Sequence, residues 1–399
     1  MRFSLLATTA LVGSLTASAA PTSGDDSTVA NLAKQAYDQA HEALSSEQKR
    51  NPGEGSCSLK NLRVRREWGS LSKKERKAYT KAVQCLQEKP ALTPSSVAPG
   101  AKSRFDDFVA THINQTLTIH YTANFLSWHR YYTWLYEEAL REECGYKGDQ
   151  PYWDWAKTAH TGLAASPIFD GSETSMSGNG ASVYTDDTGD IALGGSPDLP
   201  PLYLPTGNGG GCVESGPFKD MTVNLGPVAL SAPGGVTVTP PTGNPLDHNP
   251  RCLKRDLVDA VNQRFANASS VLSLILKPQN IYDFQMQMQG IPGSGDIGVH
   301  GGGHYTLGGD PGNDVYVSPG DPAFYLHHGN IDRVWWIWQS LSPKDRQNAI
   351  AGTRTFLNNP PSANGTLDDL IEFDYAAGPA RPIKDLMSTI RGPFCYVYL

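Results

Sequence analysis

Seven of the ten histidines in this 399-residue chain fall into two short stretches that are far apart in the sequence. The first group is His112, His120 and His129, and the second is His300, His304, His327 and His328. Imidazole is the commonest metal ligand in proteins and suits zinc, copper, iron and nickel. A lone histidine is usually a surface or core residue, but two such groups are hard to ascribe to chance. The pattern therefore indicates a metal site, which constrains how the chain folds.

The first group does not fit on one face of a single helix. Positions 104–112 predict a helix that His112 ends, and positions 128–142 predict a second helix that His129 begins. His120 falls in the segment between them. The three imidazoles therefore converge only if the chain turns back on itself. Bulky aromatic residues flank His129 in the sequence, and they would exclude water and fix the orientation of its ring.

The second group begins with a pair of histidines separated by glycines. His300 and His304 are at positions i and i+4, so they point the same way if the segment is a helix. Gly301, Gly302 and Gly303 lie between them, although glycine costs a helix up to about 1 kcal/mol per residue relative to alanine. Two interpretations remain open: a flexible loop with incidental histidines, or a helical turn kept bare beside a ligand.

The second group ends in a segment that predicts one helix over 322–341, with Pro322 in its first turn. His327 and His328 are adjacent, so their side chains point about 100° apart and only one of them is expected to reach a given metal. The geometry of a helix leaves open which one. Asp332 lies one turn after His328 and is expected to orient Arg333 or a ligand imidazole, the alternative being a surface salt bridge.

The rest of the chain predicts a single, mostly helical domain with one long insertion. Further helices are expected over 28–44, 73–87 and 253–276, the second of them capped by Ser70 or Ser72. Positions 162–250 are rich in Gly, Pro, Ser, Thr and Asp, which predicts long surface loops with a short hairpin around 222–239.

The N-terminus is typical of a secretory signal peptide. Arg2 is followed by an apolar run over 3–15 and by the small residues Ala17, Ser18 and Ala19, which fit a cleavage site. We therefore expect a signal peptide over 1–19, a helical N-terminal extension over 20–56, and a secreted protein.

The cysteines agree with an oxidising compartment. Their even number allows three disulfides, of which a bridge between Cys212 and Cys252 would restrain the insertion, but the sequence leaves the connectivity open. The glycosylation sequons begin at Asn114, Asn267 and Asn364. The net charge of −7, with no basic cluster, argues against nucleic acid as a partner. The sequence contains no second long apolar run, so no membrane span is predicted.

Several motifs together resemble one known family. The stretches His112…His120…Trp128-His129-Arg130 and His300-x3-His304…Asp321-Pro-x-Phe…His327-His328-x-Asn-x-Asp-Arg-x-Trp resemble the two copper-binding signatures of the tyrosinase, catechol oxidase and molluscan haemocyanin family. Pro151–Trp155, Arg63–Trp68 and Tyr396-Val397-Tyr398 resemble further family segments. The resemblance spans positions 57–399 and is greatest to the short secreted fungal polyphenol oxidases.

The resemblance implies a fold and a cofactor. The fold is mainly α, with a central four-helix bundle that holds a dinuclear copper site, long loops and a few short strands. Matching the motifs position by position assigns one copper ion to His112, His120 and His129, and the other to His300, His304 and His328. His327 is then not a ligand, and His41, His160 and His248 are structural or surface residues.

The resemblance also assigns residues around the metal ions. Gly301, Tyr305, Val315 and Phe324 are expected to control access of the substrate, with Val315 as a gate over the first copper. Gln289 matches a family position that holds a water molecule, and with Asn330 it is expected to assist deprotonation of a phenol.

Two departures from the family pattern carry expectations of their own. Many members have a cysteine two residues before the second histidine, linked to an imidazole, whereas this chain has Thr118 there. The thioether is therefore expected to be absent. The sequence stops one residue after Tyr398, so the shielding C-terminal domain of many long fungal members is expected to be absent too.

The function that the resemblance implies is oxidation of catechols to o-quinones with reduction of O2 to water by a monomeric enzyme. Position 289 is glutamine rather than glutamate, and Gly301 stands where strong monophenol hydroxylases of the family have an asparagine. Both differences argue against efficient hydroxylation of monophenols. The alternatives are a full tyrosinase, or an oxidase of o-aminophenols or methoxyphenols. More distant rivals are a haemocyanin-like O2 carrier and a dinuclear zinc hydrolase, the latter disfavoured because such sites usually include carboxylates.

Overall fold

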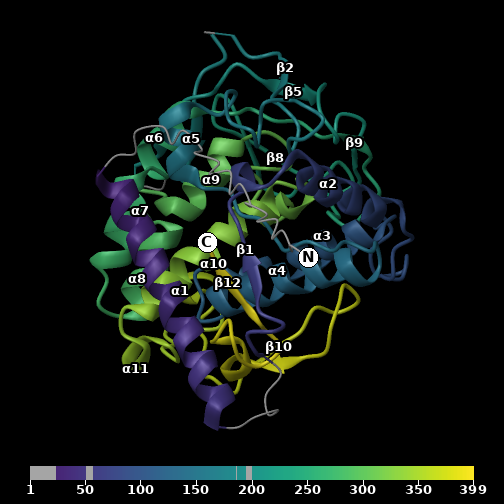
Figure 1. Cartoon of the computed structure of the whole chain (residues 1–399). Coiled ribbons are helices and arrows are strands. Elements are labelled where there is room, and N and C mark those ends of the chain that lie inside the picture. Colours follow the sequence, from purple (N-terminus) through teal and green to yellow (C-terminus); the bar gives the residue numbers. More distant parts are fainter. Residues whose placement is uncertain (1–23, 51–56, 186, 195–199) are drawn as a thin grey trace, which may run out of the picture.

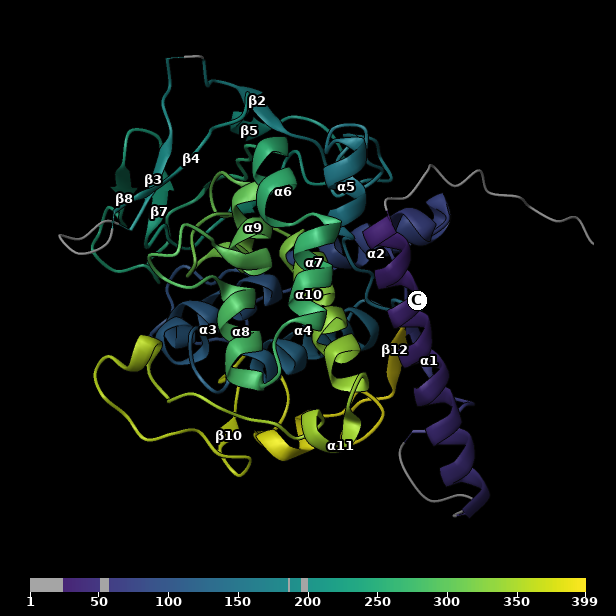
Figure 2. The same ribbon diagram turned by 90° about the vertical axis from the view of Figure 1, so that its left-hand side faces the viewer.

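Four helices form the centre of the computed structural model, which describes residues 24–50, 57–185, 187–194 and 200–399. They are α3 (Arg104–Ile119), α4 (Phe125–Glu142), α9 (Gly298–Leu307) and α10 (Phe324–Ser340). Helix α10 packs against α4 and α9, and α3 packs against α4 (Figures 1 and 2). The predicted mainly helical class with a central bundle, long loops and short strands is confirmed. The signal peptide expected over 1–19 lies outside the described residues.

Helix α3 is longer than the sequence predicted, so the expectation that His112 ends a helix was wrong. Ser103 caps the helix with a hydrogen bond from Asp106 N–H, and the helix continues to Ile119. Helix α4 begins three residues before the predicted start, at Phe125. The chain turns back between them, as the spacing of the histidines required, and Tyr121 adopts a left-handed conformation (φ 52°) in that turn.

The glycines of α9 are required by close packing, which decides between the two interpretations in favour of a bare helical turn. A Cβ on Gly302 would lie 2.9 Å from the Cβ of Phe265, and a Cβ on Gly303 would overlap the ring of His327. Helix α9 therefore approaches its neighbours more closely than any larger residue would allow.

Helix α10 is almost fully buried, from Phe324 to Gln339. It begins just after Pro322 rather than including it. The predicted helix over 253–276 is two helices, α6 (Asp259–Phe265) and α7 (Ala268–Leu276), because Asn267 caps the second with its side chain. The predicted helix over 73–87 is α2 (Lys73–Glu88), capped by Ser72.

Further helices surround this centre. The predicted helix over 28–44 extends further in both directions as α1, which packs against α7 and α10 and lies at the outer edge of the molecule in Figure 2. The remaining helices include two that the sequence analysis missed, α5 and α8. The bounds are α1 (Gly24–Arg50), α5 (Trp155–Thr161), α8 (Ile281–Gln289), α11 (Pro343–Arg346), and the 3-10 helices η1 (Trp68–Ser70), η2 (Ser318–Gly320), η3 (Phe356–Asn358) and η4 (Ile383–Leu386).

The strands are short and pair two by two. Parallel β1 and β12 join the two ends of the domain, and most of the other pairs lie in the insertion, with β2 and β5 at the top and β3, β4, β7 and β8 at the upper left of Figure 2. The hairpin expected around 222–239 is the pair β7–β8. The pairs are β1 (Arg63–Arg65) with β12 (Tyr396–Tyr398), β2 (Gly180–Ser182) with β5 (Gly210–Val213), β3 (Ile191–Leu193) with β4 (Leu202–Leu204), β6 (Thr222–Val223) with β9 (Arg251–Cys252), β7 (Leu230–Ala232) with β8 (Val236–Val238), and β10 (Leu370–Ile371) with β11 (Arg381–Pro382).

All six cysteines are paired, as Cys57–Cys395, Cys85–Cys144 and Cys212–Cys252. The expected bridge across the insertion is confirmed. Since no cysteine remains free, none is available for a thioether to an imidazole. Among the described residues, no helix is long and apolar enough to cross a membrane.

Candidate metal centre

The two groups of histidines meet inside the central bundle. His112 and His129 project from α3 and α4, and His120 follows the last residue of α3. In each of the two groups, one nitrogen from every histidine lies within 4.8 Å of the others. The groups also contact each other, because the ring centroids of His129 and His328 are 4.5 Å apart. Two compact imidazole clusters therefore lie side by side.

Backbone carbonyl groups orient the imidazoles of the first group. The Nδ1 atoms of His112, His120 and His129 lie 2.8, 3.0 and 2.7 Å from the carbonyl oxygens of Tyr316, Thr116 and Phe125. A carbonyl oxygen only accepts, so Nδ1 carries the proton and Nε2 keeps its lone pair. In the second group His304 donates in the same way to Gly312 O, at 3.2 Å.

The free nitrogens are buried without a partner. Among the described residues, Nε2 of His112, His129, His300 and His327 and both ring nitrogens of His328 lack any hydrogen bond. A buried polar atom without a partner is costly and rare in folded proteins. Here the unpartnered atoms gather at two points, which is the arrangement that bound metal ions would satisfy.

His327 and His328 differ in their hydrogen bonds. The indole N–H of Trp155 donates to Nδ1 of His327 at 3.0 Å. Because an indole only donates, the proton of a neutral His327 lies on Nε2, and a protonated nitrogen does not bind metal. His328 has no such partner and stacks on Phe324 with ring centroids 4.1 Å apart. The hydrogen bonds thus favour His328 over His327 as a ligand.

Burial keeps these imidazoles neutral. It lowers the pKa of His120 to about 4 and that of His304 to about 3, and it lowers the pKa of His112, His129 and His300 well below the usual value. Neighbouring imidazoles lower the pKa values of His112, His129, His300 and His304 further, since two positive rings would repel each other. Neutral imidazole is the form that binds metal, and a set of imidazoles without carboxylates suits copper better than a zinc hydrolase site.

The residues expected to control access lie at different depths. Phe324 is buried against the ring of His328, whereas Gly301, Tyr305 and Val315 are partly exposed. The hydroxyl of Tyr305 lies 3.4 Å from that of Ser231 in the insertion.

Gln289 and Asn330 have different surroundings. The side-chain carbonyl of Gln289 accepts the N–H of Tyr121 at 2.7 Å, and its amide donates to Gln285 O at 3.2 Å. Gln289 thus holds the turn that follows His120. The carbonyl oxygen of Asn330 is buried without a partner among the described residues.

Asp332 neither orients an imidazole nor pairs with Arg333, and it is not on the surface. Its carboxylate accepts Nε–H of Arg130 at 2.6 Å and the hydroxyls of Tyr396 and Tyr398 at 2.7 and 2.5 Å. Arg65 lies 3.4 Å from the same carboxylate. The expectation was wrong because the partners come from distant parts of the chain rather than from the same helix.

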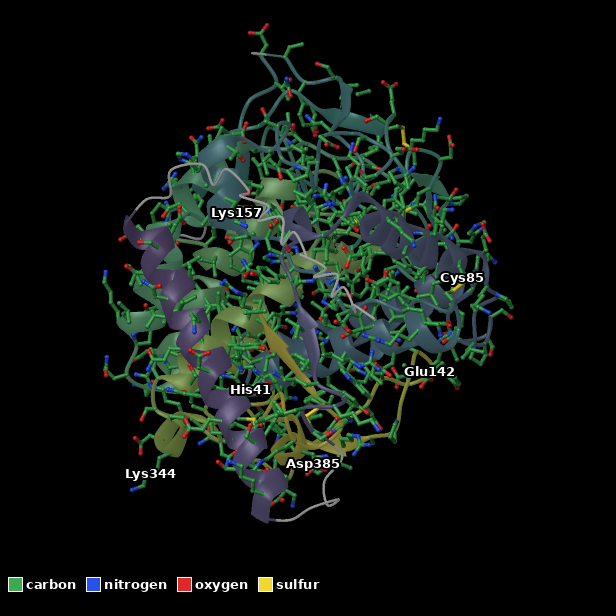
Figure 3. The ribbon with its side chains drawn as sticks, viewed as in Figure 1. His41, Cys85, Glu142, Lys157, Lys344 and Asp385 are labelled. Carbon is green, nitrogen blue, oxygen red and sulfur yellow. A yellow bond between two sulfur atoms is a disulfide. The ribbon has the colours of Figure 1, made fainter. Side chains whose placement is uncertain are left out.

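Several residues that shape the site could not be identified from the sequence. Trp155 was noted only as part of a motif, and nothing in the sequence shows that its indole reaches His327. Gly312 and Tyr316 act through backbone carbonyls, which leave no signal in the sequence. The three histidines that were set aside, His41, His160 and His248, are exposed and belong to neither cluster. Figure 3 shows His41 on the outer helix α1.

Comparison with known proteins agrees with this geometry. The model of the common central domain of tyrosinase matches residues 102–341. Tyrosinase P of Aspergillus terreus is 43% identical over 336 residues, which cover 84% of this chain and 91% of that protein. N-acetyl-6-hydroxytryptophan oxidase of Emericella nidulans is 42% identical over 355 residues, or 86% of this chain and 93% of that protein.

A solved structure of a polyphenol oxidase variant from Thermothelomyces thermophila is 45% identical and superposes with a TM-score of 0.86, over 95% of this chain and 99% of that one. The family model covers more than half of the sequence, and the two histidine clusters lie within it. The chain therefore belongs to the tyrosinase family of oxidoreductases, whose members bind a pair of copper ions.

Proposed function

We propose that this protein is a secreted polyphenol oxidase that oxidises o-diphenols to o-quinones while O2 is reduced to water. One observation carries the proposal: two clusters of neutral, buried imidazoles with unpartnered nitrogens meet inside the central bundle. The family relationship identifies the metal as copper and the substrate class as phenols. The disulfides and the expected signal peptide support secretion.

The ligands of the first copper are His112, His120 and His129, and those of the second are His300, His304 and His328. We assign His328 rather than His327 because the indole N–H of Trp155 occupies Nδ1 of His327 and leaves the proton of that imidazole on Nε2. The copper pair supplies the electron transfer between the phenol and O2. The protein holds the imidazoles neutral, fixes their direction through Nδ1 and excludes water with the surrounding aromatic rings.

The substrate ring is expected to enter over the partly exposed residues Gly301, Tyr305 and Val315, with Phe324 supporting His328 from below. The side-chain carbonyl of Asn330 has no partner among the described residues and is free to accept a hydrogen bond from a phenolic hydroxyl, whereas the carbonyl of Gln289 already accepts the N–H of Tyr121. Catechol oxidation makes a smaller demand on such an acceptor than hydroxylation of a monophenol, so we expect the diphenol activity to dominate. A monomeric enzyme is part of the same proposal.

The names of the relatives point to a second candidate substrate class. The Emericella protein is named as an oxidase of a hydroxylated tryptophan, whose ring carries a single phenolic hydroxyl. A monophenol oxidase is therefore the alternative to be tested directly.

Initial rates on a phenol and on its matching catechol, measured under air by O2 uptake and quinone absorbance, test the proposal. We expect the catechol to be oxidised clearly faster than the phenol. Equal rates on the two substrates would contradict the preference for diphenols. Reversible binding of O2 without any quinone would instead indicate a carrier.

A further inference from the structure

One short backbone segment orients a histidine in each of the two clusters. His112 and His304 donate Nδ1–H to the carbonyls of Tyr316 and Gly312, at 2.8 and 3.2 Å. His120 and His129 instead bond to carbonyls four residues earlier in their own part of the chain. The segment 312–316 therefore provides a carbonyl acceptor to one histidine in each cluster, whereas the acceptors of His120 and His129 each contact a single cluster.

The segment 312–316 is not part of a helix or a strand, so it needs another restraint. It follows Gly308 and Gly309, which both have positive φ (57° and 65°), and it ends just before η2. Backbone hydrogen bonds from Asp314 N–H to Pro311 O at 2.9 Å and from Ser318 N–H to Asp314 O at 2.8 Å shape the segment locally, but neither ties it to the insertion.

Asp314 supplies that restraint. Its side chain is fully buried, and one carboxylate oxygen accepts the N–H groups of Val228 and Ala229 at 2.6 and 3.1 Å. The other oxygen accepts the N–H of Tyr316 at 3.0 Å, within the segment itself. Burial raises the pKa of Asp314 to about 6, and the three N–H groups oppose that rise. Among the described residues no lysine or arginine forms an ion pair with it, so backbone N–H groups are what hold it.

A second bond joins the same two parts of the chain. The amide of Asn313 donates to the carbonyl of Ser231 at 3.0 Å. Residues 228–231 belong to the long insertion, for which neither the family match of the histidines nor the proposed chemistry provides a role.

We propose that Asp314 is a positioning residue for both copper ions: it ties the segment 312–316 to the insertion, and the segment holds one ligand of each ion. The inference rests on the proposed copper site. The inference also gives the insertion a function, because its residues 228–231 would hold the segment that orients the copper ligands. Val315 lies on the same segment, so its position over the site depends on the same anchor.

The test compares Asp314→Asn with a matched control, Asp256→Asn. Asp256 is also buried, and it accepts the N–H groups of Gly207 and Gly209 in the insertion at 2.8 and 3.0 Å, but its side chain has no bond to the segment 312–316. Both variants lose buried hydrogen bonds to the insertion, so their thermal stabilities should fall similarly.

Unlike the control, Asp314→Asn should release both copper ions to a chelator faster, by about 10–100-fold, as expected when an outer partner of a ligand is lost. Its absorption change on adding hydrogen peroxide should also differ from that of the unsubstituted protein, and its KM for catechol should rise. Asn313→Ala, which loses only the bond to Ser231, should show a smaller acceleration of copper release and remain folded.

The outcomes separate this inference from the proposed function. If the unsubstituted protein binds a pair of copper ions but Asp314→Asn and Asn313→Ala release them no faster than Asp256→Asn, the positioning role is wrong and the proposed function stands. If Asp314→Asn does not fold, normal copper release from Asn313→Ala is sufficient to overturn the inference. If the unsubstituted protein binds no copper pair, both proposals fail together.

Discussion

Replacing His328 with alanine is expected to remove one of the two copper ions and to lower catechol oxidation by more than about 100-fold. That exceeds the roughly 10–100-fold loss typical of an outer partner, because a ligand itself disappears. The side chain lies in the middle of the site, stacked between Phe324 and His129 with ring centroids 4.1 and 4.5 Å away. Both of its ring nitrogens are buried without a partner, whereas Nδ1 of the neighbouring His327 accepts the indole N–H of Trp155 and only Nε2 of His327 is unpartnered.

His327→Ala is the matched comparison, because it removes the neighbouring imidazole from the same helix turn. Its loss leaves the indole N–H of Trp155 without an acceptor, which costs about 1–3 kcal/mol of stability. Copper should nevertheless remain bound at both positions. Elemental analysis of the two purified variants measures the difference. Loss of copper from His327→Ala and its retention in His328→Ala would reverse the assignment.

Replacing Asp332 with asparagine is expected to destabilise the protein more than any other single change of charge. The carboxylate is buried and pairs with Arg130 at 2.6 Å, while Arg65 lies 3.4 Å away. Burial alone would raise the pKa of Asp332, but the two guanidinium groups hold it below its ordinary value. Removing one partner of a buried ion pair costs about 3–5 kcal/mol, because the other charge stays buried without compensation.

The network around Asp332 explains why the loss should also affect the metal centre. Asp332 lies one turn after His328 on α10, and Arg130 follows His129 on α4. The hydroxyls of Tyr396 and Tyr398 bind the same carboxylate, so β12 closes the domain at this point. Both ligand helices therefore depend on one buried cluster of charges.

Urea denaturation of the copper-free protein measures the effect of Asp332→Asn without interference from metal binding. The control is Asp368→Asn, since Asp368 pairs with Lys384 on the exposed surface and its loss should change nothing measurable. If the free energy of unfolding of Asp332→Asn decreased no more than that of Asp368→Asn, the buried network would not stabilise the fold as expected.

The sequence predicted much of the central bundle because its signals are local. The aromatic and apolar residues of α4 recur at three and four positions, and Ser72 caps α2 through a capping box with Glu75. The glycines of α9 left two interpretations open in the sequence, a flexible loop or a bare helical turn. The close approach of Phe265 and His327, which the sequence does not show, decides for the helical turn.

The end of α3 and the break between α6 and α7 escaped prediction because side chains decide them. The segment after His112 contains threonines, which favour other conformations, yet the hydroxyl of Thr116 donates to the carbonyl of His112 and the helix continues. Asn267 interrupts the next helical stretch because its side chain accepts the N–H of Ser270 and starts a new helix. In the sequence it was noted only as a glycosylation sequon.

The contacts around the ligands were beyond sequence reasoning because they join distant segments. The partners of Asp332 lie on β1, α4 and β12, and the carbonyl partners of His112 and His304 lie on the segment 312–316. Helical spacing placed Asp332 on the same face as His328, but it gave no information about what the other elements bring to that face.

The copper and zinc content per chain of the purified protein tests the central claim most directly. Two clusters of neutral imidazoles, three ligands for each ion, predict two copper ions per chain and no zinc. A single copper ion per chain, or zinc in place of copper, would contradict the account.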